Sequence, residues 1–369
     1  MTKLFDPVRV GPYALSHRVV LAPMTRLRAE QPGDRPGELM AEFYGQRATQ
    51  DGLLIAESTP VARNGIAYAG GPGAYLDSQI EGWRKVTDAV HAKGGRIFLQ
   101  LSHSGRMSHP DIIEGEVPAG PSVVRAEGGG LTEQGYVDFA VPRALDVAEI
   151  PRILAQYRSA ADRALQAGFD GVELHAANGY LPDQFLQDGT NLRTDEYGGP
   201  VERRARFLLE SFGVMASVWG SNRVGVRLSP SGQFAGMSDS DPESTFGYVA
   251  HRLGILGAAY LHVIEPRIKG PDDLVEGVAA PAVAAATLRK YFQGPIIAAG
   301  GFNPESARTI VSKGFADMVA FGRPFVANPD LPERIRSDIP LAAHDRATLY
   351  GGDHRGYTDY PKASASMAA

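Results

Sequence analysis

The sequence contains no cysteine among its 369 residues. That absence excludes disulfide bonds, thiolate metal sites, iron–sulfur clusters and cysteine nucleophiles together, and we expect no metal site. A strong charge of either sign is also missing, because the formal net charge is only -5 and no long run of like charges occurs. The chain thus lacks the basic surface that phosphate backbones or anionic lipids require, and we expect neither nucleic acid nor a membrane as a partner.

Long apolar stretches are missing as well. No run reaches the roughly 20 residues that a membrane-spanning helix needs. The N-terminus, MTKLFDPVRVG, lacks the charged start and apolar core of a secretion signal, so we expect a cytoplasmic protein. What the chain does have is 43% hydrophobic residues and a length that an elaborated α/β barrel occupies as one domain.

Short apolar runs recur along the chain and alternate with amphipathic stretches. Helical spacing is seen at 80–92, 150–167, 202–218 and 304–313. Apolar strands separated by helices predict a parallel sheet covered by helices, and eight such units predict a closed (β/α)₈ or TIM barrel, here with an N-terminal hairpin. The runs are VVLAP near 19, LLIAES near 53, RIFLQLS near 96, GVELH near 171, RVGVRLS near 223, YLHVIE near 260, PIIAAGG near 295 and DMVAFG near 317.

The segment from about 103 to 145 interrupts this alternation after the third strand. It is rich in Gly, Pro and His, as in SHSGRMSHP and EGGGLTEQG. A long excursion of this kind in a compact barrel is more often a lid or pocket wall than a separate domain. We therefore treat 1–369 as a single domain, and we expect the tail at 363–369 to be disordered.

A phosphate site is indicated by the last two strands. PIIAAGGFNPESA has the pattern of a strand, a glycine turn and a helix start, with Asn303 as its N-cap, and MVAFGRPF ends the next unit. Backbone amides at glycines, a helix dipole and an arginine together favour a phosphate, although each glycine alone could simply form a turn. The expected phosphate ligands are Gly300, Gly301, Gly322 and Arg323.

Polar side chains near other strand ends suit a flat heterocycle. Gln100 lies in the apolar strand IFLQL and Arg227 in VGVRLSP, where each needs a partner. A flavin pyrimidine offers matching groups, and Thr25 could face its redox side. Alternatively, Arg227 pairs with Glu173 or Glu57, Gln100 bonds a neighbouring backbone, and Thr25 caps a turn.

Several longer stretches match one family. The chain resembles the old yellow enzymes, FMN-dependent ene-reductases, over nearly its whole length. The motif at 171–199 is highly specific, whereas APMTR or AFGRP alone is not. The matching stretches are LFDPVRVGPYALSHRVVLAPMTR, GLLIAESTPV, IAYAGGPGAY, QLSHSGRMSH, GVELHAANGYLPDQFLQDGTNLRTDEYGG, AAGGFNPESA, VAFGRPFVANPDL and GYTDYP.

The resemblance implies a catalytic group and two sets of binding residues. His175 and Asn178 correspond to the pair that binds the substrate's carbonyl or nitro oxygen, and Tyr180 to the proton donor. It also implies non-covalent FMN as cofactor, with NADPH or NADH as reductant of the same pocket in ping-pong kinetics. The implied substrate pocket adds Tyr68, Ser102 and Tyr350, and the implied contacts to the FMN ring and ribityl chain are Pro23, Met24, Thr25, Ser58, Gln100 and Arg227.

The chain departs from the family pattern at a few positions. Ser102 stands where well-known members carry tryptophan, so substrate preference is open on that side of the pocket. His17 replaces an asparagine, and Pro182 and Asp183 replace a more apolar pair. Thr25 stands where another branch uses cysteine, and the lack of cysteine excludes the longer dienoyl-CoA-reductase relatives, which carry an iron–sulfur cluster.

Two other functions fit parts of the pattern. A barrel lyase or aldolase acting on a sugar phosphate would need the phosphate site and an acid–base pair, but it leaves Gln100 and Arg227 without a purpose. A non-catalytic flavin-binding protein would need only the cofactor site. The main hypothesis is an NAD(P)H-dependent reductase of activated alkenes, as a monomer or homodimer.

Overall fold

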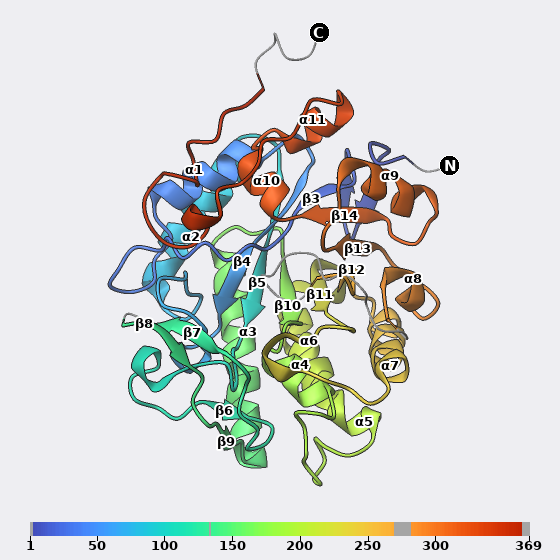
Figure 1. Ribbon diagram of the computed structural model, residues 1–369. Helices are drawn as coiled ribbons and strands as arrows, with labels where there is room; N and C mark the ends of the chain where they lie inside the picture. Colours follow the sequence, from blue (N-terminus) through green and yellow to red (C-terminus); the bar gives the residue numbers. More distant parts are fainter. Residues whose placement is uncertain (1–2, 133, 269–281, 364–369) are drawn as a thin grey trace.

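The predicted barrel is confirmed by the computed structural model, which describes residues 3–132, 134–268 and 282–363. Eight parallel strands close into a barrel around which the helices are arranged (Figure 1). Every predicted apolar run forms one of these strands. In order around the barrel they are β3 (Val19–Leu21), β4 (Leu53–Pro60), β5 (Arg96–Ser102), β10 (Gly171–Ala176), β11 (Val224–Leu228), β12 (Tyr260–Ile264), β13 (Ile296–Ala299) and β14 (Met318–Phe321), and β14 pairs with β3.

The strands are apolar on the outside and carry the functional groups inside. On β10, Val172 and Leu174 pack with the helices in the main hydrophobic core. Because side chains alternate along a strand, Glu173 and His175 point into the barrel. A separate apolar cluster that includes Phe98 fills the barrel interior at the end opposite the mouth. Polar inward residues thus collect toward the carboxyl ends of the strands.

The helices cover the barrel and mostly follow the predicted spacing. The predicted stretch at 202–218 is split into α5 (Val201–Arg204) and α6 (Arg206–Trp219). None of the helices in the described part of the chain is long and apolar enough to cross a bilayer. The others are α1 (Glu38–Arg47), α2 (Asp77–His91), α3 (Ile150–Gln166), α4 (Leu181–Leu186), α7 (Pro242–Ile255), α8 (Ala285–Leu288), α9 (Pro304–Ser312), α10 (Arg323–Ala327) and α11 (Leu331–Arg336).

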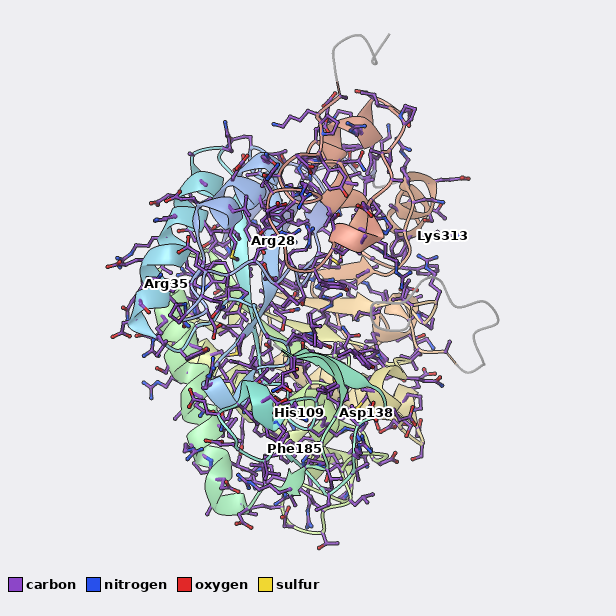
Figure 2. The ribbon with its side chains drawn as sticks, turned by 60° about the vertical axis from the view of Figure 1, so that its left-hand side comes forward. Arg28, Arg35, His109, Asp138, Phe185 and Lys313 are labelled. Carbon is purple, nitrogen blue, oxygen red and sulfur yellow. The ribbon has the colours of Figure 1, made fainter. Side chains whose placement is uncertain are left out.

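The excursion after β5 forms small sheets over one side of the barrel mouth. It contains β6 (Ala119–Gly120), β7 (Gly129–Thr132), β8 (Gly135–Asp138) and β9 (Arg143–Ala144). Figure 2 shows its residues His109 and Asp138 in the same part of the molecule as Phe185 of α4. The amide of Ala69 donates to the carbonyl of Leu131 over 3.2 Å, so the β7–β8 hairpin holds the segment next to Tyr68.

The two ends of the chain differ in how far the structure describes them. The N-terminal hairpin is present as β1 (Val8–Val10) paired antiparallel with β2 (Tyr13–Leu15). Its Val10 and Leu15 join the interior apolar cluster, so the hairpin closes the barrel floor. Of the tail predicted to be disordered, only Ala363 is described, and its amide donates to Asp330 Oδ2 over 2.7 Å. The remainder, 364–369, lies outside the described residues.

Candidate active site

The loop after β10 brings two of the three predicted catalytic side chains, those of His175 and Tyr180, into contact. His175 is the last but one residue of β10, and Asn178 and Gly179 in the following loop both adopt left-handed backbone conformations, with φ of 54° and 77°. These turns reverse the chain, so that the Tyr180 ring stacks on the His175 ring with centroids 4.1 Å apart and planes inclined by 22°. A left-handed non-glycine residue such as Asn178 is strained and is often found at functional sites. The geometry therefore places a phenol beside an imidazole at the barrel mouth.

Two buried side chains hold this loop. Asp183 Oδ2 accepts a hydrogen bond of 2.9 Å from the amide of Gly179, and Ser229 Oγ accepts one of 2.8 Å from the amide of Asn178. Ser229 Oγ also lies 3.4 Å from Asp183 Oδ2, which joins the two supports. Asp183 is one of the departures from the family pattern. In this chain it is a clamp for the catalytic loop.

Burial sets the protonation of the stacked pair. Burial is the main cause that lowers the pKa of His175 well below the ordinary histidine value, and the electrostatic influence of Arg227 and then of His262 adds to it. Burial raises the pKa of Tyr180, although Ser58 and Arg227 partly oppose that rise. At neutral pH the imidazole is therefore uncharged and the phenol keeps its proton. A neutral imidazole and a protonated phenol can both donate hydrogen bonds to an oxygen.

One pocket joins Tyr180 to four other predicted site residues. Its lining includes Thr25, Ser58, Tyr68 and Ser102, together with apolar groups from residues 27, 60, 66 and 67. Ser58 Oγ donates to Ser102 Oγ over 2.8 Å, so this side of the pocket holds a small hydroxyl pair. The structure thus brings Thr25, Ser58, Tyr68, Ser102 and Tyr180 together, as predicted.

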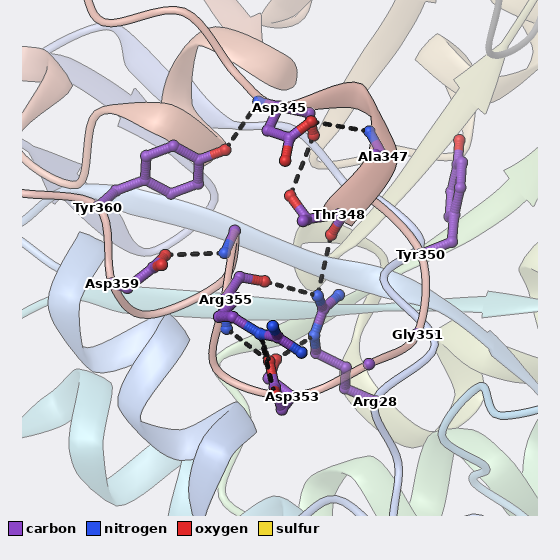
Figure 3. Close-up of a pocket in the computed structure, with 12 residues that line it drawn as sticks. Arg28, Asp345, Ala347, Thr348, Tyr350, Gly351, Asp353, Arg355, Asp359 and Tyr360 are labelled. Atoms are coloured by element: carbon purple, nitrogen blue, oxygen red, sulfur yellow. Dashed lines mark hydrogen bonds and ion pairs between the residues drawn. The ribbon is translucent and has the colours of Figure 1, made fainter.

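Tyr350 lies at the edge of this site on the C-terminal segment. Its electrostatic influence reaches both Tyr68 and Tyr180, and 44% of its surface is exposed. The segment is anchored by Arg28, whose Nε donates to the carbonyl of Asp353 over 2.8 Å and whose Nη2 donates to that of Thr348 over 2.9 Å (Figure 3). Arg28 and Tyr350 both line a second cavity, which is formed mainly by this segment. Tyr350 is therefore a rim residue.

Gln100 and Arg227, two of the expected contacts to a flavin ring, do not form the internal pairings that were the alternative prediction for them. Gln100 bonds the side chain of Glu173 and not a neighbouring backbone, with 2.6 Å between Nε2 and Oε1. Arg227, Glu173 and Glu57 all belong to the described residues, and Arg227 forms no ion pair with either glutamate. Its Nη1 lies 3.5 Å from the carbonyl of Pro23. Gln100 Oε1 and Arg227 Nε are buried without a hydrogen-bond partner. Unpaired buried groups of this kind fit a polar ring that supplies the missing partners.

The glycine turns after β13 and β14 lie next to each other because those strands pair. Gly300 and Gly301 have φ of 104° and 63°, and Asn303 caps α9 by accepting from the amide of Ser306 over 2.8 Å. A Cβ at Gly322 would lie 2.7 Å from Met24 Sδ. The turn before Arg323 therefore approaches the β3 loop that carries Pro23, Met24 and Thr25. Glycine amides, a helix N-terminus and an arginine fit a phosphate.

One polar group of the barrel interior was not singled out from the sequence. His262 of β12 is fully buried, and its Nδ1 lies 2.9 Å from Glu173 Oε2. The signal was available, because an imidazole inside the apolar run YLHVIE needs a partner just as Gln100 does. Which partner it meets depends on the register between strands, and the sequence does not show that register.

Comparison with known proteins agrees with this site. Residues 3–342 match the model of the NADH:flavin oxidoreductase / NADH oxidase family. The chain is 44% identical to flavin oxidoreductase hxnT of Emericella nidulans, covering 97% of each chain, and 44% identical to 12-oxophytodienoate reductase 1 of Oryza sativa subsp. japonica, covering 97% of this chain and 92% of that protein. Among solved structures, morphinone reductase in complex with tetrahydroNAD superposes with a TM-score of 0.91 at 44% identity over 99% of each chain.

A further solved structure is described as an old yellow enzyme homologue. The old yellow enzyme homologue from Zymomonas mobilis superposes with a TM-score of 0.91 at 41% identity, covering 98% of this chain and 99% of that one. These matches cover nearly the full length of each relative. The aldolase and the non-catalytic alternatives are therefore set aside. The chain belongs to the NADH:flavin oxidoreductase / NADH oxidase family, the old yellow enzymes, and is an FMN-dependent oxidoreductase.

Proposed function

We propose that the protein reduces the C=C bond of α,β-unsaturated carbonyl or nitro compounds, with NADPH or NADH as the reductant. The two relatives named as reductases of 12-oxophytodienoate and morphinone support this substrate class. When FMN is bound, it supplies hydride from its reduced form to the alkene β-carbon. The ring would be held by Gln100 and Arg227, and its phosphate by the turns at Gly300 and Gly322.

Side chains at the end of β10 and in the loop after it would perform the remaining steps. His175 and Asn178 bind the substrate oxygen, on which negative charge grows as hydride arrives. Preorganised hydrogen-bond donors at such an oxygen typically lower the barrier by several kcal/mol. Tyr180 then transfers its phenolic proton to the α-carbon. Because the uncharged imidazole and the protonated phenol persist at neutral pH, both roles are available without a change of protonation before the reaction.

The observation that carries this proposal is the stack of Tyr180 on His175, beside a pocket that also contains Thr25 and Ser58. One pocket serving both nicotinamide and alkene requires that the first product leave before the second substrate binds. Steady-state oxidation of NADPH and of NADH with cyclohexenone tests the proposal. We expect enone-dependent turnover with parallel double-reciprocal lines. Reductase activity toward oxygen alone, with no response to cyclohexenone or N-ethylmaleimide, would exclude alkene reduction as its function.

A further inference from the structure

Glu173 is a buried carboxylate that contacts two other buried polar side chains inside the barrel. The register of β10 on β5 places it directly opposite Gln100. Gln100 Nε2 donates to Glu173 Oε1 over 2.6 Å, and His262 Nδ1 lies 2.9 Å from Oε2. All three side chains have 0% of their surface exposed. Neither Glu173 nor His262 has a role in the proposed reaction.

The ionisation state of Glu173 decides which way the Gln100 amide faces. Burial alone would raise the pKa of Glu173, but His262, Arg227 and Gln100 together outweigh burial and lower it. An ionised carboxylate only accepts hydrogen bonds, so the Gln100 NH₂ group must face it and the His262 Nδ1 must carry the proton. Gln100 Oε1 is then turned away from Glu173.

Gln100 Oε1 has no hydrogen-bond partner among the described residues, although it is buried. A buried amide oxygen without a partner costs free energy unless a ligand pairs with it. The amide also keeps one N–H that Glu173 does not use. An acceptor with a donor beside it complements the pyrimidine edge of a flavin, where an imide N–H lies between two carbonyl oxygens. The Gln100 amide can be flipped into two orientations. Only the one with Oε1 turned away from Glu173 offers an acceptor to the imide N–H of the flavin.

We propose that Glu173, itself held by His262, is a positioning residue that fixes the orientation of Gln100 so that Oε1 receives the imide N–H of FMN. This inference rests on the FMN site described above and deepens it. Because the contact is made through Gln100, the benefit of Glu173 to FMN binding should disappear when Gln100 is absent. A residue that merely supported the barrel would act on FMN binding whether or not Gln100 were present.

The substitution Glu173→Gln tests this directly because it keeps the shape and removes the charge. His262 Nδ1–H would still donate to the new amide oxygen, so the new NH₂ group would face Gln100. Two NH₂ groups cannot bond each other, and Gln100 would flip to accept with Oε1. It would then present its NH₂ group to the imide N–H of FMN, which is also a donor. We therefore expect FMN affinity to fall about tenfold, the effect of losing one hydrogen bond.

The experiment is a double-mutant cycle on the full-length chain. FMN is removed reversibly, and the Kd for FMN is measured by flavin fluorescence for the wild type, Glu173→Gln, Gln100→Ala and the double variant. We expect Glu173→Gln to weaken binding about tenfold in the wild type but less than about twofold in the Gln100→Ala background. An equal loss in both backgrounds, or no loss in either, would overturn the inference.

A matched control separates positioning from general loss of a buried carboxylate. Asp170, just before β10, accepts from the Ile97 amide and bonds His91 Nε2, each over 2.9 Å, at the opposite end of the same strand. Asp170→Asn should change FMN affinity by less than about twofold while lowering the unfolding midpoint. If the wild-type chain itself fails to bind FMN, the FMN site as a whole is wrong, and that result is distinct from failure of the cycle.

Discussion

Tyr180 lies flat against His175 in a site that keeps the phenol protonated and the imidazole uncharged. This arrangement predicts separate effects on the two half-reactions. Tyr180→Phe removes the transferable proton but keeps the stacked ring. We expect reduction of bound FMN by NAD(P)H to be preserved and alkene reduction to slow roughly 10²- to 10⁴-fold, the usual contribution of a general acid. Stopped-flow measurement of each half-reaction checks this, and unchanged alkene reduction would remove Tyr180 as the donor.

The burial of the Asp183 carboxyl group should make the stability of the protein depend on pH. Its complete burial raises its pKa to about 7, above that of an unfolded aspartate. The folded protein therefore binds more protons than the unfolded chain between pH 4 and 7, and stability falls as pH rises through that window. The free-energy cost at pH 8 is on the order of 2–4 kcal/mol.

Asp183→Asn should remove this dependence, because an amide oxygen can still accept from the amide of Gly179. We expect denaturant unfolding at saturating FMN to show a wild-type stability that declines from pH 4 to 8 and a variant stability that declines less. Asp183→Leu loses the bond to Gly179 as well, and it should lower alkene turnover by misplacing Tyr180. Parallel pH profiles for the wild type and Asp183→Asn would contradict the shift.

The small side chain of Ser102 should let the pocket beside Tyr180 accept larger substituents than a tryptophan at this position would allow. A tryptophan there would fill the space beside Ser58 and break the 2.8 Å bond between the two hydroxyls. Ser102→Trp should raise KM for an enone with a bulky ring substituent by roughly tenfold more than for cyclohexenone, consistent with overpacking costs of about 1–3 kcal/mol. Ser102→Ala, which leaves the space open, is the control. An equal change for both enones would show that Ser102 does not limit the pocket.

Arg28 anchors the C-terminal segment, and we expect that loss of this anchor weakens substrate binding. Its buried guanidinium bonds the carbonyls of Asp353, Thr348 and Arg355, which hold Tyr350 at the rim. Arg28→Ala should destabilise the protein by about 2–4 kcal/mol and raise KM for enones, with little change in FMN affinity. Arg355→Ala is the matched control, because that guanidinium is exposed and bonds Asp353. A wild-type KM for Arg28→Ala would mean that Tyr350 is not part of the pocket.

The barrel was predictable because parallel strands are buried on both faces and therefore read as continuous apolar runs. Helix α7 was harder to recognise, because it contains Gly247 and Gly254, which weaken helix propensity, although Asp241 and Pro242 mark its start. The closeness of His175 and Tyr180, the proposed catalytic pair, was predictable because the two residues lie within a few positions at the end of one strand. Their supports were not, since Asp183 shows in the sequence only as a departure from a pattern.

Contacts between distant segments account for the rest. The pairing of Glu173 with Gln100 and His262 depends on strand register, and the bond from Arg28 to Thr348 joins residues 320 positions apart. Periodicity and motif spacing describe neighbours along the chain and contain no information on either contact. The residues expected to contact a flavin ring therefore remain a prediction from the sequence, and the groups that orient them became visible only in three dimensions.

The central claim is that the barrel mouth beside His175, Asn178 and Tyr180 would hold FMN and that the protein so loaded reduces an activated alkene. Its most direct test is the visible spectrum of the purified protein during one anaerobic cycle. We predict a flavin absorbance that bleaches when NADPH or NADH is added and returns when cyclohexenone follows. A colourless protein that cannot be reconstituted with FMN, or a bleached flavin that no enone or nitroalkene reoxidises, would contradict the claim.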